Sequence, residues 1–381
     1  MKITFILDAK LKKNNGKYYT TAAVTKEYLE KYQFDRENTL NVICRSNELE
    51  DINGLAIASG KNIEFYDVSN FSQIIKETKK FEKIIKESDF CIVKMSTVIG
   101  ILLLKYIKKY NKKYVIELVG DPFDALWNYN LKGKLLAPIM YVINKIIIKN
   151  SDNVLYVTDR YLQRRYKNKK NNIGCSDVNI FDTDNSILEK RLTKINTYGM
   201  SYVYKFGMIA SLDSKYKGHD ISIKALSKLK KSIKFELHLL GNGNKDKILK
   251  EAKKYGILEN VFFDGTLPSG KQVFNWLDGI DIYLMPSKLE GMPRALIEAM
   301  SRACICIGSR VGGIPELLKE DLLFNKNSVS QMVKVINILI SNNKKMKDAA
   351  IYCFNKSMNF KKDVLEKKRE EFYDNIMKED S

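Results

Sequence analysis

The chain has 381 residues, of which 45% are hydrophobic and 10% aromatic. This length and composition allow two buried cores, which excludes an intrinsically disordered protein and predicts two domains. The formal net charge of +20 at pH 7 indicates a polyanionic partner: nucleic acid, an anionic lipid surface or a phosphorylated small substrate.

In the first half of the chain, short β-branched runs alternate with stretches of helical periodicity. Two of these helical stretches are 21–32 and 72–87. Because helices separate most of the strands, we expect a parallel, doubly wound sheet of the α/β class. The expected strands are 2–7, 39–44, 62–68, 90–95, 113–119 and 153–158.

A polar stretch at 182–201 interrupts this alternation, which then begins again. We therefore expect two doubly wound, Rossmann-like domains, 1–192 and 193–358, facing each other across a cleft. An amphipathic helix in 359–381 closes one of these domains or crosses back to the first. Ligands of such sheets bind where strands end, at topological switch points, so site residues should follow strands. The strands expected in the second half are 203–210, 234–241, 260–266, 281–287 and 303–309.

The cysteines and histidines argue against a structural metal site. Six cysteines are present without a CxxC pair, and only two histidines accompany them. Buried reduced thiols are the better interpretation, as for Cys304 and Cys306, which alternate along an expected strand. The first residues, MKITFILD, lack the pattern of a signal peptide. No apolar run reaches the ~18–20 residues of a membrane span, so we expect a cytoplasmic protein.

The densest candidate site is LEGMPRALIEAM (289–300), which follows an expected strand. Pro293 can begin the next helix, and the first N–H groups of that helix then form an anion site. Gly291 has no side chain, so a ligand can approach the backbone closely there. Glu290 and Glu298 can accept hydrogen bonds from hydroxyls at two separate points. A ligand with phosphates in the middle and a sugar at each end, a nucleotide sugar, fits this pattern. The alternative is an ordinary helix N-terminus with Glu298 exposed.

The string LEGMPRALIEAM, followed by GSRVGGIPELL, resembles the donor site of glycosyltransferase family 4, the retaining GT-B enzymes. The likeness covers nearly all of the second expected domain. The Glu-x7-Glu pattern of that family is matched by Glu290 and Glu298. The resemblance implies that Glu290 holds hydroxyls of the donor sugar and Glu298 those of the ribose. The backbone implied to hold sugar and phosphate is that of Gly291, Met292, Pro293 and Arg294.

A second segment similar to the family is GMIASLDSKYKGHD (207–220), which follows the first strand of the second expected domain. The resemblance implies that Lys217, directly before Gly218, neutralises the donor diphosphate. The family's usual arginine is Met208 in this chain, and Lys215 is the candidate to substitute for it. The other interpretation of Lys215 is a solvated loop lysine.

Three further glycine-containing segments resemble parts of the donor site. In LLGNGNKD, Gly241 and Gly243 are expected near the nucleotide, and in FFDGTL the backbone of Thr266 and Leu267 is expected to line the base pocket. In the first domain, Gly16 is expected to open the first helix near the diphosphate. The glycine pair in VGGIPE is interpreted as a packing turn beside the site.

The segment IELVGDPFDALWNYNLKGKLLAP (116–138) is similar to a subset of the family that acts in bacterial surface-polysaccharide assembly. Where many members have a histidine, this chain has Gly120 followed by Asp121. Asp121 or Asp124 is the candidate to orient the acceptor hydroxyl or act as base, and Asp124 is alternatively a helix N-cap. Trp127 is the candidate to stack on an acceptor sugar, or a core residue.

The resemblance implies a hexosyltransferase that moves a sugar, with retention, from a UDP-sugar to a hydroxyl of a saccharide acceptor in capsular or other surface polysaccharide biosynthesis. No Asp-x-Asp pair follows a strand, so we expect neither a divalent metal nor a cofactor. The acceptor is expected to be lipid-linked, with the protein peripherally associated with the inner face of the cell membrane. Apolar helix faces at 97–109 and 134–149 would contact anionic lipid there, together with two clusters of basic residues at 105–113 and 160–170.

Two other functions compete with sugar transfer. A nucleotide-sugar 2-epimerase has the same architecture and binds the same donor, but it needs no acceptor. A nucleic-acid-binding protein would explain the positive charge, yet the chain lacks aromatic-interleaved basic motifs, so we expect no nucleic acid partner.

Overall fold

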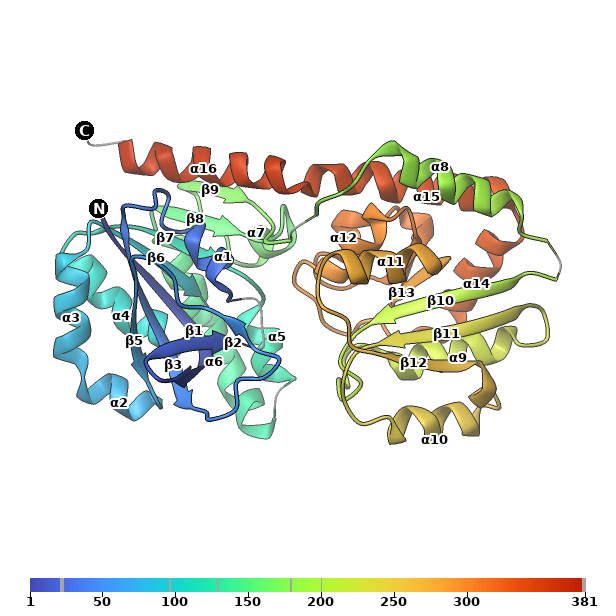
Figure 1. Ribbon diagram of the computed structural model, residues 1–381, viewed down its shortest axis with the longest axis horizontal. Helices are drawn as coiled ribbons and strands as arrows, with labels where there is room; N and C mark the ends of the chain where they lie inside the picture. The colour runs from blue at the N-terminus through green and yellow to red at the C-terminus, as the bar shows by residue number, and fades with distance from the viewer. Residues whose placement is uncertain (21–23, 96, 129, 179, 200, 379–381) are drawn as a thin grey trace. The chain divides into compact units, whose positions relative to one another are not determined.

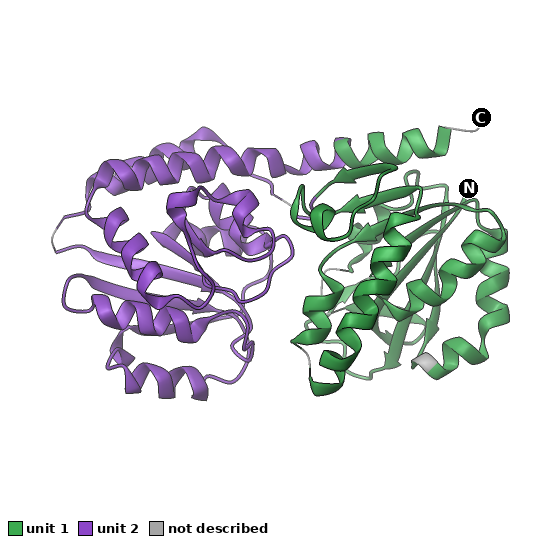
Figure 2. Cartoon of the chain, turned by 180° about the vertical axis from the view of Figure 1, so that it is seen from behind, with its two compact units in different colours: residues 1–175, 368–381 green, residues 176–367 purple. Residues whose placement is uncertain are grey.

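The computed structural model describes residues 1–381 except 21–23, 96, 129, 179, 200 and 379–381. The chain forms two compact units: Met1–Cys175 with Lys368–Ser381, and Ser176–Lys367 (Figure 2). Each unit contains a largely parallel sheet with helices on both faces, as expected for the α/β class (Figure 1). None of the described helices is long and apolar enough to cross a membrane.

The first unit is built on a sheet in which β1 is central. The parallel strands run in the order β5-β3-β1-β6-β7-β8-β9, and β2 pairs antiparallel with β1 and β4. The strands are β1 (Lys2–Asn14), β2 (Lys17–Thr20), β3 (Thr39–Glu48), β4 (Ala56–Ile57), β5 (Ile63–Val68), β6 (Phe90–Met95), β7 (Lys113–Leu118), β8 (Asn153–Tyr156) and β9 (Asn171–Gly174). The helices are α1 (Lys26–Glu30), α2 (Phe71–Lys76), α3 (Thr78–Glu87), α4 (Val98–Lys109), α5 (Pro122–Trp127), α6 (Leu131–Lys149) and α7 (Tyr161–Arg165).

The start of the chain differs from the expectation. Strand β1 does not end near residue 7 but continues to Asn14, turns, and returns as β2. Asn15 and Gly16 form the turn with φ values of 46° and 74°, and Asn-Gly is the pair that a tight hairpin with two positive φ angles favours. The expectation that Gly16 opens the first helix is therefore wrong, because Gly16 lies at the exposed tip of a hairpin.

The second unit has an all-parallel sheet in the order β12-β11-β10-β13-β14-β15. Its strands are β10 (Val203–Ile209), β11 (Lys234–Leu240), β12 (Val261–Gly265), β13 (Ile282–Met285), β14 (Ile305–Ser309) and β15 (Leu323–Phe324). Its helices are α8 (Asn185–Asn196), α9 (His219–Leu229), α10 (Asp246–Lys254), α11 (Lys271–Gly279), α12 (Arg294–Ser301), α13 (Ile314–Leu317), α14 (Val329–Ile340) and α15 (Asn343–Ser357). The chain moves outward from β10 to β12 and then returns to the other side of β10, which makes β10 and β13 the topological switch point.

The division between the units falls at Ser176, not at residue 193. Helix α8 belongs to the second unit because the buried Arg191 donates hydrogen bonds to the carbonyls of Ile280, at 2.6 Å, and Leu277, at 3.2 Å. The last helix, α16 (Lys362–Lys378), is divided: its residues up to Lys367 belong to the second unit and those from Lys368 to the first.

Candidate functional site

The candidate site lies at the carboxyl ends of β10 and β13, where the second sheet changes direction. The loop after β10 leads to α9, and the loop after β13 leads to α12. The two loops are in direct contact, because the Lys288 N–H donates to the carbonyl of Tyr216 at 2.6 Å. A Cβ atom on Gly218, where φ is 79°, would lie 2.2 Å from the carbonyl oxygen of Pro286. Only glycine permits this approach.

The loop contact brings Lys217 to Glu290, two residues that are far apart in the sequence. The ammonium of Lys217 lies 2.7 Å from a carboxylate oxygen of Glu290, whose side chain is 9% exposed. The pair is close enough for a charge-assisted hydrogen bond. The arrangement places one cation and one anion side by side directly before α12, where a phosphate and a sugar hydroxyl can each find a partner.

Helix α12 begins without a side-chain cap from any described residue. Pro293 is the residue before the helix, not its first residue as the sequence suggested, and its carbonyl accepts from the N–H groups of Leu296 and Ile297. The first N–H groups of the helix thus point toward the loop without a capping side chain, which suits an anion. Met292 is buried beside this start, and Arg294 is exposed.

The loop containing Glu290 and Gly291 is held in place by the glycine pair of VGGIPE. The N–H of Gly313 donates to the carbonyl of Gly291 at 2.8 Å. Gly312 has φ of 54°, and a Cβ atom there would lie 1.8 Å from the carbonyl oxygen of Glu290. This geometry agrees with the interpretation of the pair as a packing turn beside the site.

Glu298 differs from Glu290 because no described residue donates a hydrogen bond to its carboxylate. Burial raises the pKa of Glu298, and the charge of Arg294 one turn earlier opposes this only in part. The interpretation of Glu298 as an exposed glutamate is wrong, because the residue is half-buried. A partly desolvated carboxylate without a donor is suited to accept hydrogen bonds from ligand hydroxyls.

The loops after β11 and β12 continue the same edge of the sheet. The N–H of Gly241 donates to the carbonyl of Gly265 at 2.6 Å, and the carbonyl of Asn242 accepts from Leu212 at 2.7 Å. Gly243 follows in the same loop. Thr266 is exposed and Leu267 half-buried directly after β12. These residues are therefore at the correct end of the strands, while their contact with a nucleotide stays a prediction.

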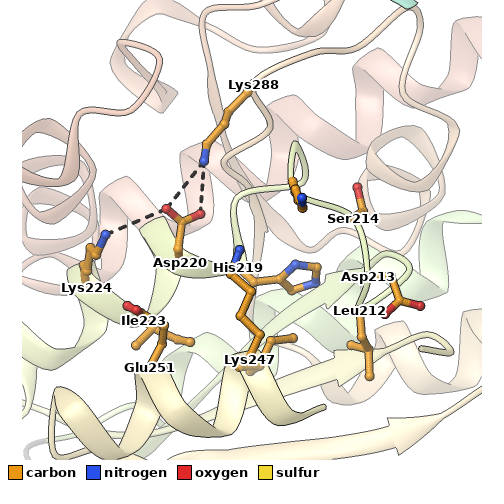
Figure 3. Close-up of a pocket in the computed structure, with 12 residues that line it drawn as sticks. Leu212, Asp213, Ser214, His219, Asp220, Ile223, Lys224, Lys247, Glu251 and Lys288 are labelled. Atoms are coloured by element: carbon orange, nitrogen blue, oxygen red, sulfur yellow. Dashed lines mark hydrogen bonds and ion pairs between the residues drawn. The ribbon is translucent and has the colours of Figure 1, made fainter. Parts of the chain in front are cut away.

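Lys215 lies in the wall of a different cavity from the Lys217–Glu290 pair. This cavity, of about 310 Å³, is formed by the loop after β10 together with α9 and α10 (Figure 3). Asp220 accepts ion pairs from Lys288, at 3.3 Å, and Lys224, at 3.8 Å. Burial lowers the pKa of His219 to about 4, so its ring is neutral at pH 7. Lys217 and Glu290 do not line this cavity.

In the first unit, Asp121 is the N-cap of α5 and is 5% exposed. It accepts hydrogen bonds from the N–H of Phe123 at 2.9 Å, from Tyr166 at 2.7 Å and from Tyr161 at 3.1 Å. Arg165 forms an ion pair with the same carboxylate. These contacts occupy both oxygens, so they give Asp121 a positioning role, and its catalytic role stays a prediction.

The surroundings of Asp121 also define the roles of Asp124 and Trp127. The N-cap of α5 is Asp121 and not Asp124, whose carboxylate instead accepts from Tyr161 at 3.2 Å. Trp127 is not a core residue, because it is 42% exposed and stacks on Phe123 with a centroid distance of 5.2 Å. A Cβ atom on Gly120 would meet no atom within 4 Å outside its chain neighbours, so there is space for the start of a side chain at this position.

The partners of Asp121 are not evident from the local sequence pattern. Arg165, Tyr161 and Tyr166 belong to DRYLQRRY, which the composition marks only as a basic cluster. One signal could have identified them: tyrosine and arginine follow each other at a four-residue spacing on a short helix after the neighbouring strand. Such a spacing puts both side chains on one helix face, the face that meets α5.

Comparison with known proteins agrees with this geometry. The model of the family "Glycosyl transferases group 1" matches residues 204–354, from β10 into α15. "Protein CapJ" of Staphylococcus aureus is 30% identical over 350 residues, which cover 88% of this chain and 86% of CapJ.

Two solved structures show the same fold. Anabaena Alr3699/HepE in complex with UDP-glucose has a TM-score of 0.68 over 98% of this chain and 100% of that chain, at 15% identity. WaaG, a glycosyltransferase involved in lipopolysaccharide biosynthesis, has a TM-score of 0.65 over 99% and 100%, at 15% identity. The predicted GT-B fold is confirmed, and the chain belongs to the group 1 family of glycosyl transferases.

Proposed function

We propose that this protein transfers a hexosyl group from a UDP-sugar to a hydroxyl of a saccharide acceptor, with retention of the anomeric configuration. The reaction would contribute to a capsular or other surface polysaccharide. HepE is solved in complex with UDP-glucose, and WaaG is involved in lipopolysaccharide biosynthesis. These relatives support the donor class and the process, and the site chemistry supports the same assignment.

The observation that carries the proposal is the Lys217–Glu290 pair at the uncapped start of α12. A diphosphate placed there would receive the charge of Lys217 and the N–H groups of the helix. Glu290 would then turn from Lys217 toward hydroxyls of the donor sugar. Glu298 lies further along the helix and would accept from the ribose, so the two carboxylates hold the two ends of one donor.

The chemistry of such a site is mainly electrostatic. As the bond between the sugar and the diphosphate breaks, negative charge grows on the leaving oxygen, and preorganised donors stabilise that charge. Lys217 and the start of α12 supply these donors without a divalent metal in this proposal. The incoming hydroxyl would lose its proton to the donor phosphate itself or to a carboxylate of the first unit.

The acceptor would bind to the first unit at α5. Exposed Trp127 offers an aromatic face for a sugar ring, and Asp124 offers a carboxylate. We propose that this acceptor is lipid-linked and that the protein is peripherally associated with the inner face of the membrane. A 2-epimerase would need no acceptor, and this difference separates the two activities experimentally.

The test is nucleotide release from UDP-, GDP- and ADP-sugars with EDTA present. We expect slow release from one UDP-sugar, lost by roughly tenfold or more in Glu298→Ala and retained in Glu259→Ala, an exposed glutamate of the same unit. Restoration of activity only by magnesium would overturn the metal-free mechanism. Conversion of the sugar to its epimer without an acceptor would establish the epimerase, and neither release nor binding of any donor would refute the donor site.

A further inference from the structure

Helix α6 has an unusual distribution of side chains. Its buried residues are small or polar, namely Gly133, Ala137 and Asn144, together with Ile148. Five of its aliphatic side chains point the other way and are between 53% and 79% exposed. An amphipathic helix of a soluble domain normally buries its aliphatic side chains. The exposed residues are Leu131, Leu135, Ile139, Val142 and Ile146.

These five side chains form one continuous stripe. Their spacing of three or four residues keeps them on a single face of a helix. Leu136 widens the stripe. Single exposed aliphatic residues are common on proteins, but a contiguous apolar patch indicates an interaction. We call these six residues the α6 surface: Leu131, Leu135, Leu136, Ile139, Val142 and Ile146.

Helix α4, in the other segment that the sequence predicts to contact lipid, has a different distribution of side chains. In α4, the apolar residues Ile99, Leu103 and Ile107 are buried in the first unit. The expectation that the face at 97–109 contacts lipid is therefore wrong. Of the two predicted faces, only that of α6 is available to a partner.

The charged residues of α6 indicate what kind of partner binds the α6 surface. The helix contains four exposed lysines, Lys132, Lys134, Lys145 and Lys149, and no acidic residue. Lysine side chains beside an apolar stripe bind anionic headgroups while the stripe enters the boundary between headgroups and acyl chains. We propose that the α6 surface docks in the plane of an anionic membrane.

A second copy of this chain fits the α6 surface less well. Two α6 helices packed face to face would bring the lysines of both into one interface, with no acidic side chain on either helix to neutralise them. A membrane with anionic lipid provides the missing negative charge. The inference rests on the proposed function in one respect: it would explain how α5 reaches a lipid-linked acceptor.

The test is flotation of the full chain with phosphatidylcholine vesicles, with and without phosphatidylglycerol. We expect wild type to float with the anionic vesicles. The double variant Ile139→Glu/Val142→Glu should lose at least about tenfold in vesicle-bound fraction, because two charged side chains replace apolar contact with lipid. The matched control is Ile75→Glu, a 66% exposed isoleucine of α2 in the same unit, which should float like wild type.

A second double variant, Lys134→Glu/Lys145→Glu, tests the charge. It should float less with anionic vesicles at low salt and lose most of the salt dependence of wild type. Equal flotation of wild type and Ile139→Glu/Val142→Glu would overturn the inference. So would a dimer of the wild type that this variant separates into monomers while neither protein floats.

Nucleotide release measured on the same preparations keeps the two proposals apart. Normal release by a variant that no longer floats supports the α6 surface, because the donor site is intact. Flotation without release from any donor would instead count against the proposed function alone.

Discussion

At the scale of single residues, the site uses two glutamates in opposite ways. Glu290 is neutralised by Lys217 at 2.7 Å, so its charge is tolerated in a buried position. Glu298 has no such donor among the described residues, and burial raises its pKa. A partly desolvated carboxylate lowers the stability of the folded protein. Such a cost is typical of binding-site residues whose hydrogen-bond partner is supplied by the ligand.

Glu298→Gln should therefore stabilise the free protein at neutral pH. The folded pKa of Glu298 is raised, so wild type loses stability as pH rises through that pKa, whereas glutamine does not ionise. The melting temperature of the variant should exceed that of wild type at pH 7, and the difference should shrink toward pH 4. Thermal unfolding at several pH values, with Glu259→Gln as the exposed control, measures this. A pH-independent difference would contradict the assignment of the effect to ionisation.

At the scale of elements, most of the strand and helix order could be predicted, because alternating β-branched runs and helical periodicity are local signals. The β1–β2 hairpin was missed even though Asn15–Gly16 is a local turn signal, since the lysine-rich run before it resembles a loop. The contacts that the site residues make with one another could not be predicted from the sequence. Nothing local connects Lys217 with Glu290, or Asp121 with Arg165, because their contacts depend on how neighbouring strands align.

The N-cap of α5 provides a test of such a non-local contact. Asp121→Ala removes the cap and leaves Arg165 without its buried partner, which should lower the free energy of unfolding by about 2–4 kcal/mol. Asp121→Asn keeps the cap and should lose less. Asp124→Ala, which removes no cap, should cost within about 1 kcal/mol. Urea denaturation compares the three, and equal losses for Asp121→Ala and Asp124→Ala would show that α5 does not depend on Asp121.

At the scale of the whole molecule, the end of the chain completes the first unit. Glu117 of β7 is 1% exposed and accepts hydrogen bonds from Arg369 at 2.9 Å and from Tyr373 at 2.8 Å, both in α16. Tyr32 donates to its other oxygen at 3.0 Å. The expected C-terminal helix is therefore not an accessory of the second unit alone. Glu117 is therefore a buried carboxylate of the first 175 residues, and the cation nearest to it, Arg369, belongs to the last residues of the chain.

This dependence predicts the effect of removing the cation. Arg369→Ala leaves Glu117 buried with only Lys94, at 3.8 Å, as a charged neighbour among the described residues, and should destabilise the first unit by about 3–5 kcal/mol. The matched control is Lys368→Ala, whose half-exposed side chain lies 3.9 Å from Asp159 and should contribute less than about 1 kcal/mol. Hydrogen exchange separates the units: in Arg369→Ala, protection should fall in β7 and in α16 after Lys367, while β10, β13 and α12 stay protected. Loss of protection throughout the second unit as well would show that the two units unfold together, and unchanged protection in β7 would show that Glu117 does not need Arg369.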